Sequence, residues 1–175
     1  HAITVPMAGR MIHVAGRQEF QAYGTRPDEV IHSVSRRDLN AILLDAAEAT
    51  GRVTTRFDHR CDGIDVARRV ATFTVGPEGS TRETGVEIPF GTLFGCDGAS
   101  SEVRDGVVAA SGGTVSIEPL DHGYKELTLP AGPGGAFALG PNALHIWPRG
   151  QFMLIALANP NGDFTLTLFL PNEAP

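Results

Sequence analysis

One stretch decides the fold of this chain: Gly95-Cys96-Asp97-Gly98-Ala99-Ser100-Ser101-Glu102-Val103-Arg104. The apolar residues 92–94 before it predict a strand, the Asp-Gly pair predicts a sharp turn, and Ser100 or Ser101 is a typical helix cap. An isolated Asp-Gly pair more often marks an ordinary turn. A carboxylate at a strand–turn–helix junction, however, lies beside backbone N–H groups and can help to hold a polar ligand. The segment is therefore a candidate binding turn. Its helix would carry on one face Val103, Val107 and Val108.

The composition indicates an acidic protein with a hydrophobic core. The chain has 175 residues, 42% of them hydrophobic, which suits one domain or one domain plus part of another. A formal net charge of −6 gives no electrostatic support for a nucleic-acid partner or an anionic membrane surface. Only Lys125 and Arg149 among the basic residues follow Asp105, so we expect the first half to hold any anionic ligand.

Cysteine content and the ends of the chain bear on its cellular setting. Cys61 and Cys96 form neither a disulfide framework nor a metal-ligand spacing, which favours a reducing, cytoplasmic location. No apolar run reaches membrane-spanning length. Because the chain starts at His1 and not at a methionine, we expect it to be part of a longer protein.

The first half mixes short strands with two helices, a pattern expected for part of an α/β nucleotide-binding domain. The first of the two helices is predicted to begin at Ser35, which with Asp38 resembles a capping box, and to end at Gly51. Asp62-Gly63 predicts a turn. Strands are predicted at residues 10–14, 19–23, 30–34, 53–57, 70–75 and 86–90. The apolar stripe of the helix is Leu39, Ile42, Leu43, Ala46 and Ala47.

The second half predicts β-structure with breaks rich in proline and glycine. Strands are expected at residues 123–129, 143–147, 152–157 and 164–170. In the third of these, alternation places Met153, Ile155 and Leu157 on one face and apolar residues on the other. Both faces should therefore be covered. From the pattern alone, a plain core is the commoner explanation, and a ligand-binding wall is the alternative.

Six short segments occur in a characteristic order along the chain: residues 6–13 (PMAGRMIH), 23–24 (YG), 33–36 (SVSR), 95–98 (GCDG), 122–124 (HGY) and 144–149 (LHIWPR). None of these segments is specific alone, but the ordered set covers nearly the whole chain. In this order they resemble the flavoprotein aromatic hydroxylases, and among these the members that hydroxylate L-kynurenine.

This resemblance implies an α/β fold and a flavin enzyme. Residues 1–112 would form part of a Rossmann-like FAD-binding domain with substrate-contacting strands, and residues 113–175 a truncated, mostly antiparallel β-sheet substrate domain. The implied reaction uses FAD, NADPH and dioxygen to convert L-kynurenine to 3-hydroxykynurenine. Because the cofactor carries out this chemistry, no catalytic side chain is expected. The protein would position the reactants and exclude water from them. A homodimer is compatible with the resemblance.

The resemblance also assigns substrate contacts. Arg10 corresponds to the arginine that binds the substrate carboxylate, and Tyr23 to the tyrosine that assists it. A guanidinium can bind a carboxylate through two parallel hydrogen bonds. Without the resemblance, Arg10 would be a solvated surface residue and Tyr23 a half-buried strand residue. The apolar wall around the substrate ring would comprise Leu144, Met153, Ile155, Leu157 and Phe169.

Three residues correspond to flavin contacts: Arg36, Cys61 and Asp97. Cys61 is smaller than the residue usual at its position, and a small buried thiol is the alternative role. Ala8 replaces a basic residue common in the family, which removes an auxiliary charge but leaves Arg10 in place.

The sequence contains no Gly-x-Gly-x-x-Gly after an opening strand, so we expect this chain alone to bind the cofactor poorly. Two other functions stay open. The chain could belong to a non-catalytic small-molecule-binding module that kept the pocket and lost the flavin. It could also belong to a related aromatic hydroxylase with another acidic substrate.

Overall fold

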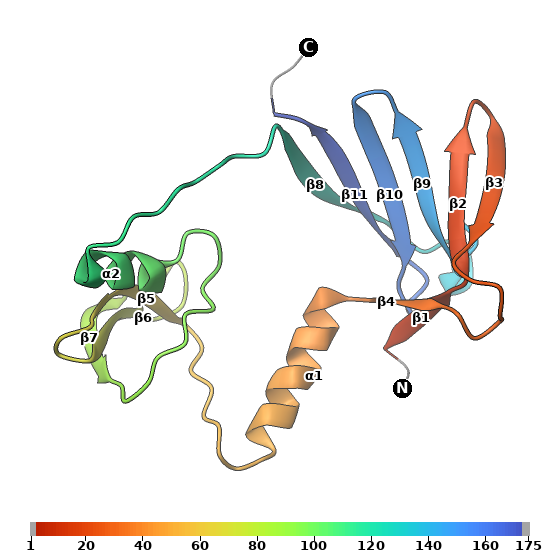
Figure 1. Cartoon of the computed structure of the whole chain (residues 1–175). Helices are drawn as coiled ribbons and strands as arrows, with labels where there is room; N and C mark the ends of the chain where they lie inside the picture. Colours follow the sequence, from red (N-terminus) through yellow and green to blue (C-terminus); the bar gives the residue numbers. More distant parts are fainter. Residues whose placement is uncertain (1–2, 173–175) are drawn as a thin grey trace. The chain divides into compact units, whose positions relative to one another are not determined.

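The computed structural model describes residues 3–172, which form two compact units (Figure 1). The first unit combines the segment up to Arg52 with the segment from Pro119 onward, and the second covers Val53–Glu118. Strands from both ends of the chain thus join one unit, which cuts across the boundary predicted at residue 112. The assignment of residues 1–112 and 113–175 to a flavin domain and a substrate domain stays a prediction.

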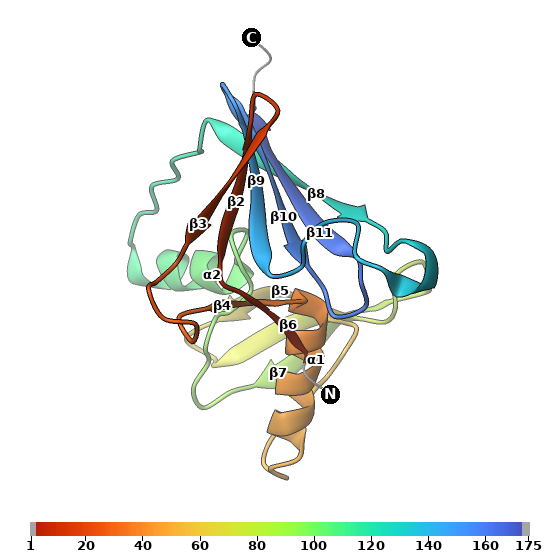
Figure 2. The same cartoon turned by 90° about the vertical axis from the view of Figure 1, so that its right-hand side faces the viewer.

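A six-stranded sheet dominates the first unit, in the order β3-β2-β9-β10-β11-β8 (Figure 1). Every neighbouring pair is antiparallel except β2 and β9, which run parallel. The prediction of a mostly antiparallel sheet is confirmed. Figure 2 shows the twist of this sheet. The strands are β2 (Gly9–Val14), β3 (Arg17–Ala22), β8 (His122–Leu129), β9 (Ala143–Arg149), β10 (Phe152–Ala158) and β11 (Phe164–Pro171).

A two-stranded sheet and one helix complete the regular structure of this unit, with a short 3-10 turn at Pro133–Gly135. β1 (Thr4–Met7) pairs with β4 (Ile31–Val34); the sequence did not predict β1, because Pro6 disfavours an interior strand. The helix α1 (Arg36–Glu48) begins as predicted, with the Ser35 hydroxyl accepting from the Asp38 backbone N–H at 3.3 Å. No helix in the described part of the chain is long and apolar enough to span a membrane.

The core of the first unit lies on one face of the sheet. Ala156, Ala158 and Phe164 are completely buried there, and Val5 of β1 packs against them. His145 and Trp147 project from β9 to the same face, because His145 is paired with Ala156 and Trp147 with Leu154. The opposite face therefore remains for other contacts.

The second unit is a three-stranded sheet with one helix. β6 (Val70–Val75) lies between β5 (His59–Asp65) and β7 (Glu83–Pro89). The helix α2 (Glu102–Ser111) contacts β5 at Gly106, where a Cβ would come within 2.3 Å of Ile64 Cγ1. Only a residue without a side chain permits this approach.

Three sequence predictions are wrong in this unit. Residues 53–57 and 92–94 form no strand: Phe57 and Phe94 are 67% and 84% exposed, and neither segment pairs with another strand of residues 3–172. Apolar pattern alone does not make a strand, because its backbone groups also need a partner. Asp62-Gly63 is no turn but lies at a β-bulge inside β5, where the pairing shifts between Cys61 and Gly63.

Candidate functional site

The predicted substrate contacts that lie within strands share one face of the six-stranded sheet, opposite the core. Strand register places them there: Arg10 pairs with Leu144, and Met153 pairs with Phe169. The pairing of Ile146 with Ile155 and the alternation of side chains along β9 and β10 put Leu144, Met153, Ile155 and Leu157 on the same face. We call this surface the wall face; its predicted contacts are Arg10, Leu144, Met153, Ile155, Leu157 and Phe169.

The two faces of the sheet differ in packing near the C-terminal end of β10. Ala156 and Ala158 on the core side are fully buried there, whereas Ile155 and Leu157 on the wall face are half-buried, as is Met153 earlier in the strand. An apolar surface that is only half covered can receive an apolar ligand. The geometry is compatible with the wall interpretation, and the roles of the individual residues stay predictions.

Arg10 and Tyr23 lie together at the β2–β3 side of this face. The Arg10 Cζ is 5.5 Å from the centre of the Tyr23 ring, a cation–π distance. Tyr23 follows β3 directly, and its backbone N–H donates to the Ala8 carbonyl at 3.0 Å. A Cβ on Gly9 would come within 2.3 Å of the Gln21 carbonyl oxygen, so a glycine lets β2 and β3 approach beside Arg10.

The loop after Tyr23 is held by one carboxylate. Glu29 Oε2 accepts from the backbone N–H groups of Thr25 at 2.7 Å and Arg26 at 3.0 Å. This side chain packs so closely on Gly24 that a Cβ there would lie 2.0 Å from Oε2. The predicted Tyr23-Gly24 pair is therefore fixed on both sides.

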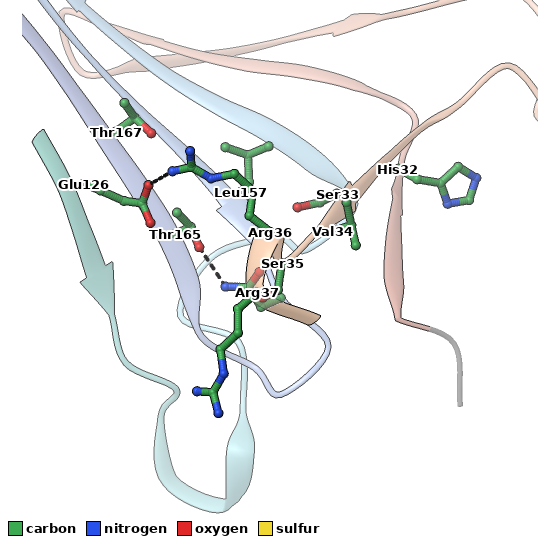
Figure 3. Close-up of a pocket in the computed structure, with 11 residues that line it drawn as sticks. His32, Ser33, Val34, Ser35, Arg36, Arg37, Glu126, Leu157, Thr165 and Thr167 are labelled. Atoms are coloured by element: carbon green, nitrogen blue, oxygen red, sulfur yellow. Dashed lines mark hydrogen bonds and ion pairs between the residues drawn. The ribbon is translucent and has the colours of Figure 1, made fainter. Parts of the chain in front are cut away.

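A cavity of about 400 Å³ opens beside the wall face at the start of α1 (Figure 3). Leu157 belongs to both the wall face and the cavity. Thr165 and Thr167 bring hydroxyl groups to the same lining, since they pair with Leu157 and Ile155. The lining residues are His32, Ser33, Val34, Ser35, Arg36, Arg37, Glu126, Leu157, Asn159, Thr165 and Thr167.

Arg36, a predicted flavin contact, lines this cavity as the first residue of α1. Its Nη2 forms an ion pair with Glu126 Oε2 on β8, and the two side chains point toward each other in Figure 3. The charge of Glu126, and then its hydrogen bond, raise the pKa of Arg36 further above its ordinary value, and Tyr124 adds to this effect. A positively charged donor is thus fixed beside the apolar wall.

Asp97 and Cys61, the other predicted flavin contacts, lie in the second unit. Asp97 accepts from the Ser101 hydroxyl and from the Val103 backbone N–H at 3.2 Å. The Ser101 hydrogen bond is the main cause, and the Val103 one the next, of an Asp97 pKa below its ordinary value. The expectation that this carboxylate lies beside backbone N–H groups is confirmed.

Ser101 and Arg104, in the same segment as Asp97, stabilise the turn that leads into α2. Ser101 caps α2 by accepting from the Arg104 backbone N–H at 2.9 Å, and the Arg104 guanidinium donates to the Ala99 carbonyl at 2.5 Å. Cys61 is half-buried on β5, with its thiol 3.7 Å from the Gly63 carbonyl oxygen. Asp97 and Cys61 both lie in the second unit and Arg36 lies in the first, and the flavin contacts of all three residues stay predictions.

No role was predicted for Glu126 or Tyr124, although Tyr124 lies in the segment 122–124 that carries the resemblance. Both project from β8 to the wall face, because Tyr124 pairs with Phe169 and Glu126 with Thr167. The Tyr124 and Phe169 ring centres are 6.1 Å apart. Their spacing of two in a predicted strand indicates that they share a face, but it does not say which face that is.

His145 and Trp147, from the resemblance segment 144–149, lie on the core side. His145 Nε2 is 2.8 Å from the Gly140 carbonyl oxygen and its Nδ1 is 2.9 Å from His13 Nε2. The Trp147 ring stacks on His13 at 4.3 Å. Burial first, and the neighbouring His145 second, lower the pKa of His13, which favours a neutral ring. This cluster joins β2 to β9 away from the candidate site.

Comparison with known proteins gives whole-chain similarities, although no family model matches. The chain is 47% identical to "Kynurenine 3-monooxygenase" of Myxococcus xanthus, an alignment that covers 100% of this chain and 37% of the relative. The protein of the same name from Dictyostelium discoideum is 41% identical, with 99% and 36% covered. The chain thus spans little more than a third of these relatives.

A solved structure supports the fold. The crystal structure of CmlS, a flavin-dependent halogenase, matches with a TM-score of 0.59 at 13% identity, covering 96% of this chain and 30% of that one. This match confirms the predicted fold class, a mixed α/β chain that contains a mostly antiparallel sheet. The resemblance inferred from the ordered motifs is likewise confirmed by the relatives.

Proposed function

We propose that this chain is part of a kynurenine 3-monooxygenase, an FAD- and NADPH-dependent enzyme that hydroxylates L-kynurenine to 3-hydroxykynurenine. One observation carries the proposal beyond the similarity of sequence. The wall face is apolar along its middle strands and has a cation at each side, Arg10 on β2 and Arg36 beside β8.

This arrangement suits an aromatic amino acid lying across the strands. Adjacent strands are about 4.8 Å apart, so the wall from β2 to β11 spans roughly 14 Å. The substrate carboxylate would bind Arg10, with Tyr23 beside the guanidinium. Its ring would then lie on Ile155 and Leu157, whose burial by the ring supplies the apolar part of the binding energy.

The cavity beside Leu157 is compatible with a flavin. It offers the Arg36 guanidinium and the hydroxyl groups of Thr165 and Thr167 at the side of an apolar surface. Bound FAD, reduced by NADPH, would supply activated oxygen for transfer to the substrate ring. The side chains of this chain orient the ring and exclude water from it. Asp97 and Cys61 are proposed as further flavin contacts.

The test is turnover by the complete protein. With FAD, NADPH and dioxygen, we expect L-kynurenine to yield 3-hydroxykynurenine. Bound flavin and turnover of a different acidic aromatic compound would favour the related hydroxylase. A protein that binds kynurenine but no flavin would instead be the non-catalytic module.

A further inference from the structure

Glu126 lines the candidate site, but the predicted substrate and flavin contacts give it no role. It is an acid on the wall face of β8, and its carboxylate reaches the guanidinium of Arg36, 90 residues earlier in the chain. The pair joins the first residue of α1 to the sheet across the side of the cavity (Figure 3).

Stability does not account for this pair. The Arg36 and Glu126 side chains are 77% and 49% exposed, and exposed ion pairs contribute little to the free energy of unfolding. The second unit contains a comparable pair, Arg68 and Glu87, 59% and 46% exposed, with contacts of 2.8 and 2.9 Å. Arg36 and Glu126 both line the cavity beside Leu157, whereas neither Arg68 nor Glu87 does.

The position of Glu126 suits it to orient Arg36. Glu126 is paired with Thr167, which is paired with Ile155, so the carboxylate lies in register with the apolar wall. It contacts Nη2 of Arg36, and a guanidinium has further N–H donors that can face a ligand. A long arginine side chain loses rotamer freedom when it binds, and a partner that already holds it reduces that loss.

We propose that Glu126 is a positioning residue that holds the Arg36 guanidinium beside the wall face, oriented to bind the flavin. This inference rests on the proposed function, in which Arg36 contacts FAD.

The experiment measures the FAD dissociation constant of the complete apoprotein by flavin titration. We expect Glu126→Gln, which keeps the shape but removes the charge, to weaken FAD binding about three- to tenfold. Glu126→Asp should restore most of the affinity. Glu87→Gln is the matched control: it removes the same charge from an exposed ion pair in the second unit and should leave FAD affinity at the wild-type value.

The double variant with Arg36→Ala separates positioning from a general structural role. If Glu126 acts through Arg36, Glu126→Gln should cause no further loss in the Arg36→Ala background. Wild-type affinity or tighter FAD binding in Glu126→Gln would overturn the inference, and so would an equal loss in the Arg36→Ala background. Wild-type protein that binds no FAD would refute the proposed function as well. Wild-type protein that hydroxylates kynurenine, with Glu126→Gln behaving as Glu87→Gln, would refute this inference alone.

Discussion

Replacing Phe169 by alanine in the complete protein should separate a binding wall from a plain core. Phe169 lies on the wall face between Met153 of β10 and Tyr124 of β8, and it is half-buried. Truncating a fully buried phenylalanine costs about 3–5 kcal/mol, so we expect roughly 2 kcal/mol here. If Phe169 also shields the flavin and the substrate ring, its loss admits water, and NADPH consumption yields hydrogen peroxide in place of product.

Two quantities are measured for each variant: the ratio of 3-hydroxykynurenine formed to NADPH consumed, and the free energy of unfolding from a denaturation curve. Phe164→Ala is the matched control, because Phe164 is fully buried on the core side. It should cost the full 3–5 kcal/mol or so, while the folded fraction keeps the wild-type ratio. A Phe169→Ala protein that is destabilised yet retains the wild-type ratio would refute the wall interpretation.

Three further predictions follow from the same geometry. Arg10→Ala should raise the KM for kynurenine by a factor of tens to several hundred at normal flavin content, since losing a bidentate contact costs about 2–4 kcal/mol; an unchanged KM would make Arg10 a surface residue. Asp97 has a lowered pKa, so its hydrogen bonds from Ser101 and Val103 at the start of α2 should stabilise the protein above about pH 4 and lose this effect as the pH falls through the lowered pKa. The difference in stability between wild type and Asp97→Asn should therefore shrink in acid, and a difference independent of pH would contradict this role of the Asp97 carboxylate. The complete protein should purify with FAD while the 175-residue chain does not, and a yellow, stoichiometrically loaded chain would contradict this expectation.

Helix starts and strand positions could be predicted from the sequence where neighbouring residues alone determine them. Ser35 and Ser101 cap the two helices as expected, and the strands of the second half lie within a residue or two of their predicted bounds. Alternation also predicted that Met153, Ile155 and Leu157 share a face, because side chains alternate with a fixed period of two.

What depended on pairing between distant segments was not predictable. Nothing local shows that β2 adds in parallel to β9 and so brings Arg10 onto the face of Leu144. The ion pair of Arg36 with Glu126 depends in the same way on tertiary structure. Residues 53–57 and 92–94 have the apolar pattern of strands, but a strand also needs a partner, which composition does not reveal.

The most direct test of the account is a structure of the complete protein with FAD and L-kynurenine bound. We predict the substrate carboxylate on the Arg10 guanidinium beside Tyr23, the substrate ring on Ile155 and Leu157, and the flavin in contact with Arg36. Kynurenine bound away from the wall face, with Arg10 in solvent, would contradict it.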